Sequence, residues 1–351
     1  MGRTFLADSF ATNTGTYYIK VNLSALFLYG ASIYYIVEIK LSLMNTRESN
    51  MANQPHPIQY QGSKRGIAST ILNFLPKKIE RLVEPFAGTA AMSVAASAQR
   101  VSQQYWINDL NKPLIQLLEL IIEHPYDVVD GYSQVWNEQI GDSIKHYYQI
   151  RDKFNTSNDP ILFLYLLARC VKGAVRYNNE GLFNQSPDKR RKGTQPEKMF
   201  KNIEGVSKLL KGKCVFTSFD YKEVLSQVKS TDFVYMDPPY QGVCGNKDSR
   251  YYSGINFDGF VSSLEELNRK DILFAVSYDG KRGNKTFGQN LPKNLNLKRV
   301  EIQVGRSSQA TLLGKQEITI ESLYLSNPLI HHLQDKKIDF YPLHKQLAII
   351  N

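Results

Sequence analysis

Short apolar runs alternate with segments of helical periodicity from about residue 80 onward. Five candidate strands end at or just before acidic or small residues: 81–86, 104–108, 214–219, 232–236 and 272–277. This alternation predicts a parallel sheet with helices on both faces. Two later runs, about 298–304 and 317–325, alternate apolar with polar residues and are typical of an antiparallel closing pair. The predicted fold class is α/β, with ligands expected where the strands end.

The second and third candidate strands are separated by more than a hundred residues, too many for one crossover helix. Helical patterns at 114–123 and 160–171 are followed by a polar, basic stretch at 172–200. We therefore expect an inserted domain. The predicted organisation is an N-terminal extension at 1–50, a catalytic domain at 55–112 and 213–328, the insert at 113–212, and a C-terminal tail at 329–351.

Positive charge is concentrated in two segments of a chain whose formal net charge is +10. Residues 169–213 hold twelve Lys and Arg against four acids, and residues 281–315 hold eight against Glu301 alone. Two basic segments on an otherwise acidic chain favour a phosphate backbone as partner. For Lys189–Lys192 alone, a solvated surface run is an equally good interpretation.

Three cysteines without metal-ligand spacing, Cys170, Cys214 and Cys244, favour neither a zinc site nor a disulfide framework. No metal is expected, and a cytoplasmic setting fits best. The apolar stretch 21–39 is marginal for a bilayer span and lacks the flanks of a secretory signal. We expect no stable membrane partner and a dispensable extension.

The most informative segment is Asp237-Pro238-Pro239-Tyr240, which directly follows the apolar run 232–236. Two prolines end the strand and leave a carboxylate and an aromatic ring at the sheet edge. An exocyclic base amine needs such a set, because acceptors for its two N–H bonds favour the geometry in which its lone pair can attack. Asp237 and the Pro238 carbonyl would accept these bonds, and Tyr240 would stack on the base. The alternative is a simple strand-ending turn with a surface tyrosine.

This segment resembles motif IV of the amino-methyltransferases, whose Asp-Pro-Pro-Tyr form is typical of adenine-N6 enzymes. Val83–Met92 resembles their motif I cofactor loop, with Ala90 in place of the usual second glycine. Asp109, 21 residues after Gly88, is placed to accept hydrogen bonds from a ribose diol or to cap a helix. Residues 59–64 resemble motif X, and Asp220 occupies the motif III place. The resemblance implies S-adenosylmethionine as cofactor, bound by Tyr60, Lys64, Glu84, Phe86, Gly88, Thr89, Asp109 and Asp220.

The insert adds a second, more specific resemblance. Residues 172–184 are similar to the hairpin of the Dam-like, D12-class adenine methyltransferases, with Lys172 where asparagine is common and Gln185-Ser186-Pro187 departing from the usual Val-Pro. In that family the hairpin enters DNA, so Arg176 is a candidate for guanine recognition, and Tyr177 and Asn178 for wedging or backbone contact. The resemblance covers about residues 57–326 and implies DNA contacts from Lys172, Arg176, Tyr177, Asn178, Lys189, Arg190, Arg191 and Lys192.

Taken together, the resemblance implies a Rossmann-like class I methyltransferase fold with a mixed seven-stranded sheet and a mostly helical target-recognition insert. The expected reaction is methylation of a flipped adenine in double-stranded DNA, in a restriction–modification system with a cognate endonuclease, by a monomer or weak dimer. Three alternatives stay open: an N4-cytosine or RNA amino-methyltransferase, a non-catalytic DNA-binding relic, and a membrane-anchored binding protein. C5-cytosine chemistry is disfavoured, because the chain has no Pro-Cys dipeptide.

Overall fold

The computed structural model describes residues 7–11, 17–21, 54–239, 255–282, 285–287, 290–306 and 318–335. Residues 1–53 and 54–351 form two separate compact units. In the first, β1 (Ala7–Ala11) and β2 (Tyr17–Val21) pair as an antiparallel hairpin. Most of the apolar stretch 21–39 lies outside the described residues. None of the helices within the described ranges is long and apolar enough to cross a membrane.

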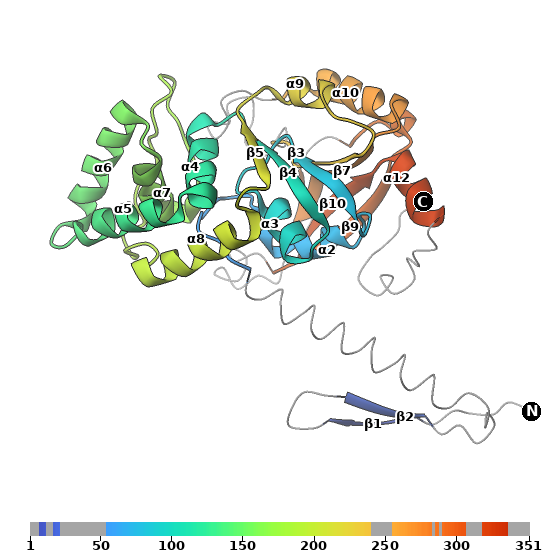
Figure 1. The fold of residues 1–351 in the computed structure, drawn as a ribbon, viewed down its shortest axis with the longest axis horizontal. Coiled ribbons are helices and arrows are strands. Elements are labelled where there is room, and N and C mark those ends of the chain that lie inside the picture. The colour runs from blue at the N-terminus through green and yellow to red at the C-terminus, as the bar shows by residue number, and fades with distance from the viewer. Residues whose placement is uncertain are drawn as a thin grey trace, which may run out of the picture. The chain divides into compact units, whose positions relative to one another are not determined.

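A single mixed sheet is the centre of the second unit (Figure 1). Its strand order is β5-β4-β3-β6-β7-β10-β9, and the short strand β8 pairs with β7. The first five strands of this order are parallel, while β10 runs antiparallel to both neighbours. The bounds are β3 (Ile79–Glu84), β4 (Ser102–Asn108), β5 (Cys214–Thr217), β6 (Asp232–Met236), β7 (Leu273–Arg282), β8 (Lys285–Phe287), β9 (Lys298–Arg306) and β10 (Ile318–Leu325).

The predicted strands are thus confirmed, and so is the antiparallel closing pair, with ends that differ by a few residues. The mixed sheet confirms the predicted α/β fold class. The chain order reverses between β3 and β6, because β4 and β5 lie on one side of this pair and β7 on the other. Asp232, at the start of β6, accepts two hydrogen bonds from the Arg81 guanidinium, at 2.9 and 2.6 Å. This bidentate pair fixes the register of the two strands at the point of reversal.

Helices cover both faces of the sheet. One face packs on α2 (Ala68–Leu72) and α3 (Ala91–Ala98), and the other on α9 (Tyr221–Ser226) and α10 (Phe257–Arg269). Alternate strand residues divide between the two cores: Leu82 belongs to the first and Val83 to the second. The chain also forms η1 (Lys64–Gly66), η3 (Lys293–Leu295) and α12 (Asn327–Asp335).

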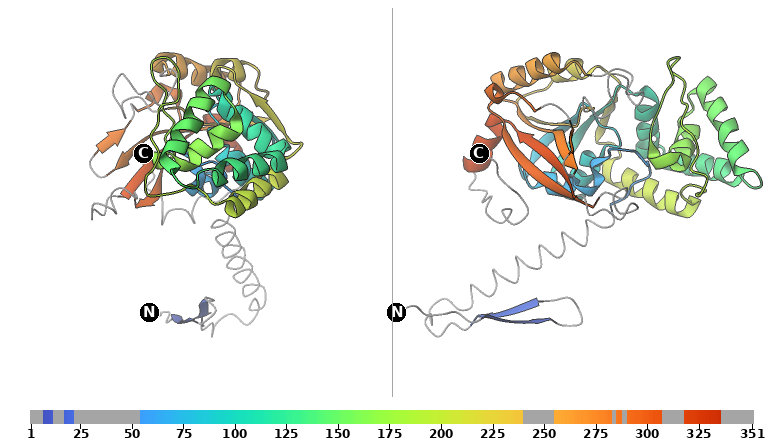
Figure 2. Two further views of the ribbon diagram at one scale, coloured as in Figure 1. Left: turned by 90° about the vertical axis from the view of Figure 1, so that its left-hand side faces the viewer. Right: turned by 180° about the vertical axis from the view of Figure 1, so that it is seen from behind.

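The long connection between β4 and β5 is mostly helical, as predicted. It contains α4 (Lys112–Glu123), α5 (Pro125–Asn137), α6 (Ser143–Ser157), α7 (Pro160–Arg169), η2 (Val171–Gly173) and α8 (Pro196–Leu210). Four of these helices carry proline in the first turn, where the missing N–H would have no helical partner anyway. Figure 2 shows these helices gathered beside the sheet, with α4 and α8 nearest to it.

Candidate active site

A cavity of about 350 Å³ opens where β3 and β6 end, at the point where the strand order reverses. Open α/β sheets bind ligands at this position, and the volume falls within the range of small-molecule sites. Seven segments of the chain meet there. The cavity is lined by residues 60–64, 84–89, 91–92, 109–111, 177, 219–222, 235, 237–239 and 255–256.

Asp237 lies on the wall of this cavity, directly after the fully buried strand β6. The Lys64 ammonium lies 2.9 Å from Asp237 Oδ1, and both side chains are largely buried, at 6% and 20% exposed. The pKa of Asp237 is raised to about 6, mainly by burial and also by nearby Glu321, while Lys64 opposes the shift. Pro238 and Pro239 complete this wall. Tyr240 lies outside the described residues.

Glu84 ends β3 and faces the same cavity. Its Oε1 accepts hydrogen bonds from the Ser93 backbone N–H at 2.8 Å and from the Ser93 hydroxyl at 2.5 Å, within the first turn of α3. Burial raises the pKa of Glu84 to about 7, although the Ser93 hydrogen bonds favour the ionised form. A carboxyl that titrates near neutrality therefore lines the cavity.

Asp109 follows β4 and holds the loop after β3. Its Oδ2 accepts from the Gly88 N–H at 2.9 Å, and its Oδ1 accepts from the Asn111 N–H at 2.9 Å. Each oxygen has room for a further donor, because a carboxylate oxygen has two lone pairs. Burial raises the pKa of Asp109, while these two N–H groups oppose the shift. Asp109 is not the cap of a helix: the residue before α4 is Asn111.

The loop after β3 is held from two sides. Gly88 has a positive φ of 52°, and a Cβ there would lie 3.9 Å from the Tyr60 ring, so Tyr60 stands over the loop. The hydroxyls of Ser63 and Thr89 lie 2.9 Å apart and hydrogen-bond. On the other side, the Phe86 ring packs against Tyr221 at a centroid distance of 5.2 Å. The predicted cofactor residues of motifs X and I are thus brought together.

Asp220 lies at the mouth of the cavity as the N-cap of α9. Its Oδ1 accepts from the Lys222 N–H at 2.9 Å, and the residue is exposed. Two apolar neighbours at the mouth, Leu110 at 50% and Phe219 at 38%, are unusually exposed for their type. Sequence reasoning missed both, although each directly adjoins a predicted aspartate.

The hairpin at 172–184 is closed by backbone pairing and by one side chain. Arg176 O accepts from the Asn184 N–H at 2.9 Å, and the Asn178 side-chain oxygen accepts from the N–H groups of Glu180 and Leu182. Asn178 thus shapes the turn itself, whereas Arg176 is exposed on its surface. Lys172 is also exposed.

Tyr177 is buried at the cavity, whereas Arg176 is exposed on the hairpin surface. Tyr177 is only 8% exposed and lines the cavity. Its ring packs edge-on against Phe183, and its hydroxyl donates to Asn111 Oδ1 at 3.4 Å. The predicted wedging or backbone contact of Tyr177 with DNA stays a prediction. The hairpin therefore supplies one wall of the cavity as well as an exposed face.

The hairpin and the motif X segment are joined at one glycine. Gly173 O accepts from the Gln61 N–H at 2.9 Å, and a Cβ on Gly173 would lie 2.8 Å from the Gln59 carbonyl group. Gly173 also has a positive φ of 60°. Only glycine satisfies both conditions without strain.

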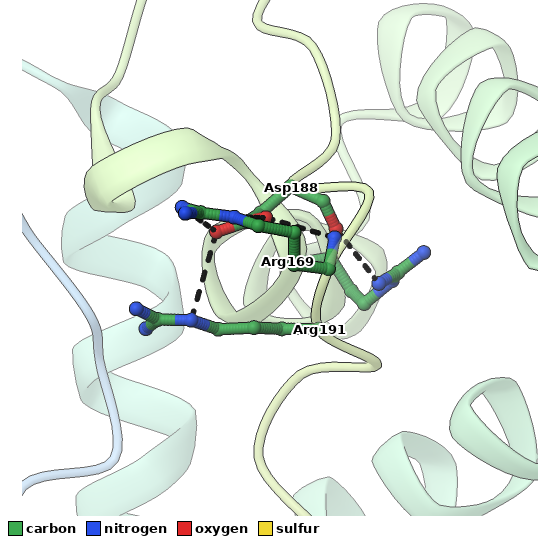
Figure 3. Close-up of polar contacts among 4 residues, drawn as sticks. Arg169, Asp188 and Arg191 are labelled. Carbon is green, nitrogen blue, oxygen red and sulfur yellow. Dashed lines mark hydrogen bonds and ion pairs between the residues drawn. The ribbon is translucent and has the colours of Figure 1, made fainter.

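Lys189–Lys192 are exposed, but two of the four are paired with one acid (Figure 3). Asp188 lies 3.3 Å from Arg190 Nε and 3.6 Å from Arg191 Nε. Hydrogen bonds from the side chain and the backbone N–H of Arg190 lower the pKa of Asp188. Arg169, counted with the basic segment, is 1% exposed and donates to the backbone carbonyls of Asp188 and Ser143. Its role is to hold the segment in place.

Two departures from the family pattern occur at residues with positive φ. Ala90, before α3, has φ 53°, and Lys172 has φ 59°. Glycine and asparagine adopt this region most readily, which explains their use at these positions in the related motifs. Ala90 and Lys172 hold the same backbone conformation at some cost in strain.

Within the described ranges, no cluster of three or more His, Cys, Asp or Glu side chains could hold a metal ion. Sequence reasoning missed Glu321, an acid on β10 whose Oε2 lies 3.2 Å from Lys64 Nζ. Its strand was predicted as an alternating polar and apolar run, so a charged residue there gave no signal.

Comparison with known proteins identifies the family. The model of the D12 class N6 adenine-specific DNA methyltransferases matches residues 60–305. The chain is 31% identical over 229 residues to the retron Ec67 DNA adenine methylase of Escherichia coli, covering 64% of this chain and 73% of that protein. It is 29% identical over 271 residues to the type II methyltransferase M.MjaIII of Methanocaldococcus jannaschii, covering 69% and 89%.

The chain therefore belongs to the D12 class of N6 adenine-specific DNA methyltransferases, and DNA is its substrate class. A DNA adenine methylase of Salmonella typhimurium is also similar, at 28% identity over 204 residues, covering 57% of this chain and 70% of that protein. Family membership confirms the predicted resemblance, fold and class of enzyme. The roles of the individual site residues stay predictions.

Proposed function

We propose that this enzyme transfers a methyl group from S-adenosylmethionine to the N6 amine of an adenine rotated out of duplex DNA. One observation carries the proposal: Asp237–Pro239 shares a cavity wall with the loop at Gly88 and with Asp109. The residues predicted for the amine and those predicted for the methyl donor thus face one space. A base still stacked in the duplex could not reach Asp237, because the carboxylate is largely buried.

The donor and acceptor groups of the cavity fit S-adenosylmethionine. The oxygens of Asp109 have lone pairs for a ribose diol, and Asp220, exposed at the mouth, suits the adenine amine. Glu84 offers a buried carboxylate to a cationic group. We assign the pocket to the predicted set Tyr60, Lys64, Glu84, Phe86, Gly88, Thr89, Asp109 and Asp220, with Phe86 shaping the loop through its contact with Tyr221.

When bound, S-adenosylmethionine supplies a methyl group on a sulfonium sulfur that departs with the bonding electron pair. The protein then has to position and desolvate the acceptor amine. Asp237 and the Pro238 carbonyl accept the two N6–H bonds, and the N6 lone pair forms the new N–C bond. The amine becomes cationic and gives one proton to the Asp237 carboxylate, which exchanges it with solvent.

We assign DNA binding to the exposed face of the insert. The exposed Arg176 suits bidentate contact with guanine, whereas the exposed Lys172 and Lys189–Lys192 suit phosphates. Asn178 acts by holding the turn, and Tyr177 acts on the cavity side. Similarity to a type II methyltransferase supports a restriction–modification context with a cognate endonuclease.

Tritium transfer from labelled S-adenosylmethionine to unmethylated duplex DNA tests the proposal, with nucleoside chromatography of the product. We expect label in N6-methyladenine. Asp237→Ala should lower kcat by about 10²–10³-fold, because an acceptor that strengthens in the transition state is lost. Cofactor affinity, measured by calorimetry, should stay within about twofold.

Asp258→Ala is the matched control, because Asp258 is an exposed aspartate in the first turn of α10. This variant should keep the parent turnover. Near-full turnover by Asp237→Ala would overturn the role of Asp237. Label in N4-methylcytosine would overturn the choice of base, and an absence of label on DNA would overturn the proposed reaction.

A further inference from the structure

Glu321 occupies a position that usually belongs to the core. Side chains alternate along β10, and Leu323 and Leu325, which share the face of Glu321, are fully buried in the core on the side of α2 and α3. The Glu321 side chain is 20% exposed. An acid so placed needs a charged partner, because desolvation of a lone carboxylate is unfavourable.

A β-bulge sets the place of Glu321. Opposite β10, strand β7 carries one extra residue, because Glu321 pairs with Gly280 whereas Leu323 pairs with Ser277. Asp279, in the bulge, has a positive φ of 63° and accepts from Arg299 Nη2 at 3.2 Å and from the Tyr324 hydroxyl. These bonds hold the bulge in one geometry.

Two further features keep β10 in register. A Cβ on Gly280 would lie 2.7 Å from the Ile320 carbonyl oxygen, so the strands are closely apposed at this point. Because β10 runs antiparallel to β7, its first residues lie beside the end of β7, at the carboxyl edge of the sheet. Glu321 therefore reaches Lys64, beside Asp237, from a strand that lies more than 80 residues further along the chain than Asp237.

The partner of Glu321 is the lysine that also contacts Asp237. Lys64 Nζ lies 2.9 Å from Asp237 Oδ1 and 3.2 Å from Glu321 Oε2. The ammonium is 6% exposed and lies between the two carboxylates. The Lys64 ammonium has three N–H donors but occupies only one position. The attraction of the Glu321 carboxylate therefore affects how closely the ammonium approaches Asp237.

We propose that Glu321 is a positioning residue for methyl transfer: it shares the Lys64 ammonium with Asp237, so that Lys64 engages one Asp237 oxygen and leaves the other for the adenine amine. This inference rests on the proposed function. It also gives the cluster of two carboxylates and one ammonium a net charge of −1. That charge is opposite to the one that the amine acquires as the N–C bond forms, so the cluster stabilises the transition state.

Glu321→Gln tests the proposal, because the amide keeps the shape of the side chain and removes its charge. We expect kcat to fall about 10–100-fold. The KM values for DNA and S-adenosylmethionine should change by less than about twofold, because Glu321 is not among the residues that line the cavity. Glu321→Asp keeps the charge on a shorter side chain and should restore part of kcat.

The pH profile of kcat separates positioning from a merely structural role. Among the residues that the structure describes, the charged and titratable groups around Asp237 are Lys64, Glu321, Glu84 and Tyr235. Activity requires ionised Asp237 and should rise with pH through about 6. Glu321→Gln removes a neighbouring negative charge and should move this rise to lower pH, whereas Lys64→Met should move it to higher pH.

Glu301→Gln is the matched control, since Glu301 lies on the neighbouring strand β9 and pairs with Arg299 at 3.5 Å. It should keep the parent kcat and pH profile. If the parent enzyme methylates adenine while Glu321→Gln retains both kcat and the pH profile, the proposal is wrong and the proposed function stands. If the parent transfers no methyl group, both are wrong. Should Glu321→Gln fail to fold, an unchanged kcat in Glu321→Asp would overturn the proposal.

Discussion

Carboxyl groups have pKa shifts of opposite sign in the cavity and in the basic segment at 169–192. In the cavity, burial raises the pKa of Glu84, Asp109 and Asp237. In the basic segment, hydrogen bonds from Arg190 lower the pKa of Asp188. The two environments suit different tasks. The desolvated carboxylate acceptors of the cavity suit chemistry on a poorly nucleophilic amine, whereas the solvated Lys and Arg donors of the basic segment suit contact with phosphates.

The two regions meet at Gly173, and changing it tests whether they form one functional unit. Gly173→Ala should destabilise the protein by about 2–4 kcal/mol, because the new Cβ adds a backbone clash to the strain of a positive φ. The clash is with Gln59, next to the Tyr60 that stands over the cofactor loop. We therefore also expect weaker binding of S-adenosylmethionine. Denaturant unfolding and calorimetry measure the two effects.

Gly212→Ala provides the control for Gly173→Ala. Gly212 also has a positive φ, of 70°, but nothing lies within 4 Å of a Cβ placed there. Its substitution should destabilise by about 1 kcal/mol, from backbone strain alone. Equal losses in the two variants would mean that the contact between the hairpin and motif X contributes nothing.

Within the cavity, Glu84→Gln tests whether the raised pKa serves binding at the expense of stability. The folded-state pKa of about 7 lies above the ordinary value of 4.5, so folding favours the protonated form. Stability from this group is present below pH 4.5 and is lost as pH rises through 7, by up to about 3 kcal/mol. The ligand-free Gln variant should therefore have the higher Tm at pH 8.

Cofactor affinity should respond in the opposite direction. A cationic ligand group favours ionised Glu84, so the affinity of the parent for S-adenosylmethionine should rise between pH 6 and 8. In Glu84→Gln this rise should disappear, and affinity at pH 8 should be lower. A parallel rise in parent and variant would show that Glu84 does not face the cationic group.

The sequence predicted the cavity better than the basic segment, for a physical reason. Cavity residues come directly after strands, and parallel strands of one sheet end at one edge, so Glu84, Asp109 and Asp237 had to lie near one another. Counting charges in the insert has no such geometric constraint. It included Arg169, which is buried, and could not foresee that Asp188 pairs with Arg190 and Arg191.

Long-range packing explains what the sequence could not predict. Tyr177 lines the cavity because the hairpin packs against Asn111, a contact 66 residues away in sequence. Glu321 reaches Lys64 only because of the antiparallel register of β10 and the bulge in β7. The strained conformation of Ala90 is indicated by the glycine that the related motif has at this position and not by alanine itself, which favours the helix that follows it.

Two kinds of variant in the basic segment separate recognition of the DNA sequence from electrostatic attraction to any duplex. Arg176→Ala should reduce affinity for the methylated site by about 1–3 kcal/mol and relax its sequence choice, because a bidentate base contact is lost. The double change Lys189→Ala and Lys192→Ala should weaken binding to all duplexes alike. It should also reduce the dependence of affinity on salt by about one unit of slope per lysine.

These two lysines are the better choice than Arg190 and Arg191, whose charges are already partly compensated by Asp188. Fluorescence anisotropy on specific and unrelated duplexes at several salt concentrations measures both effects. Because loss of a base contact leaves the number of phosphate contacts unchanged, a salt slope that falls equally in both variants would contradict the assignment of Arg176 to base recognition.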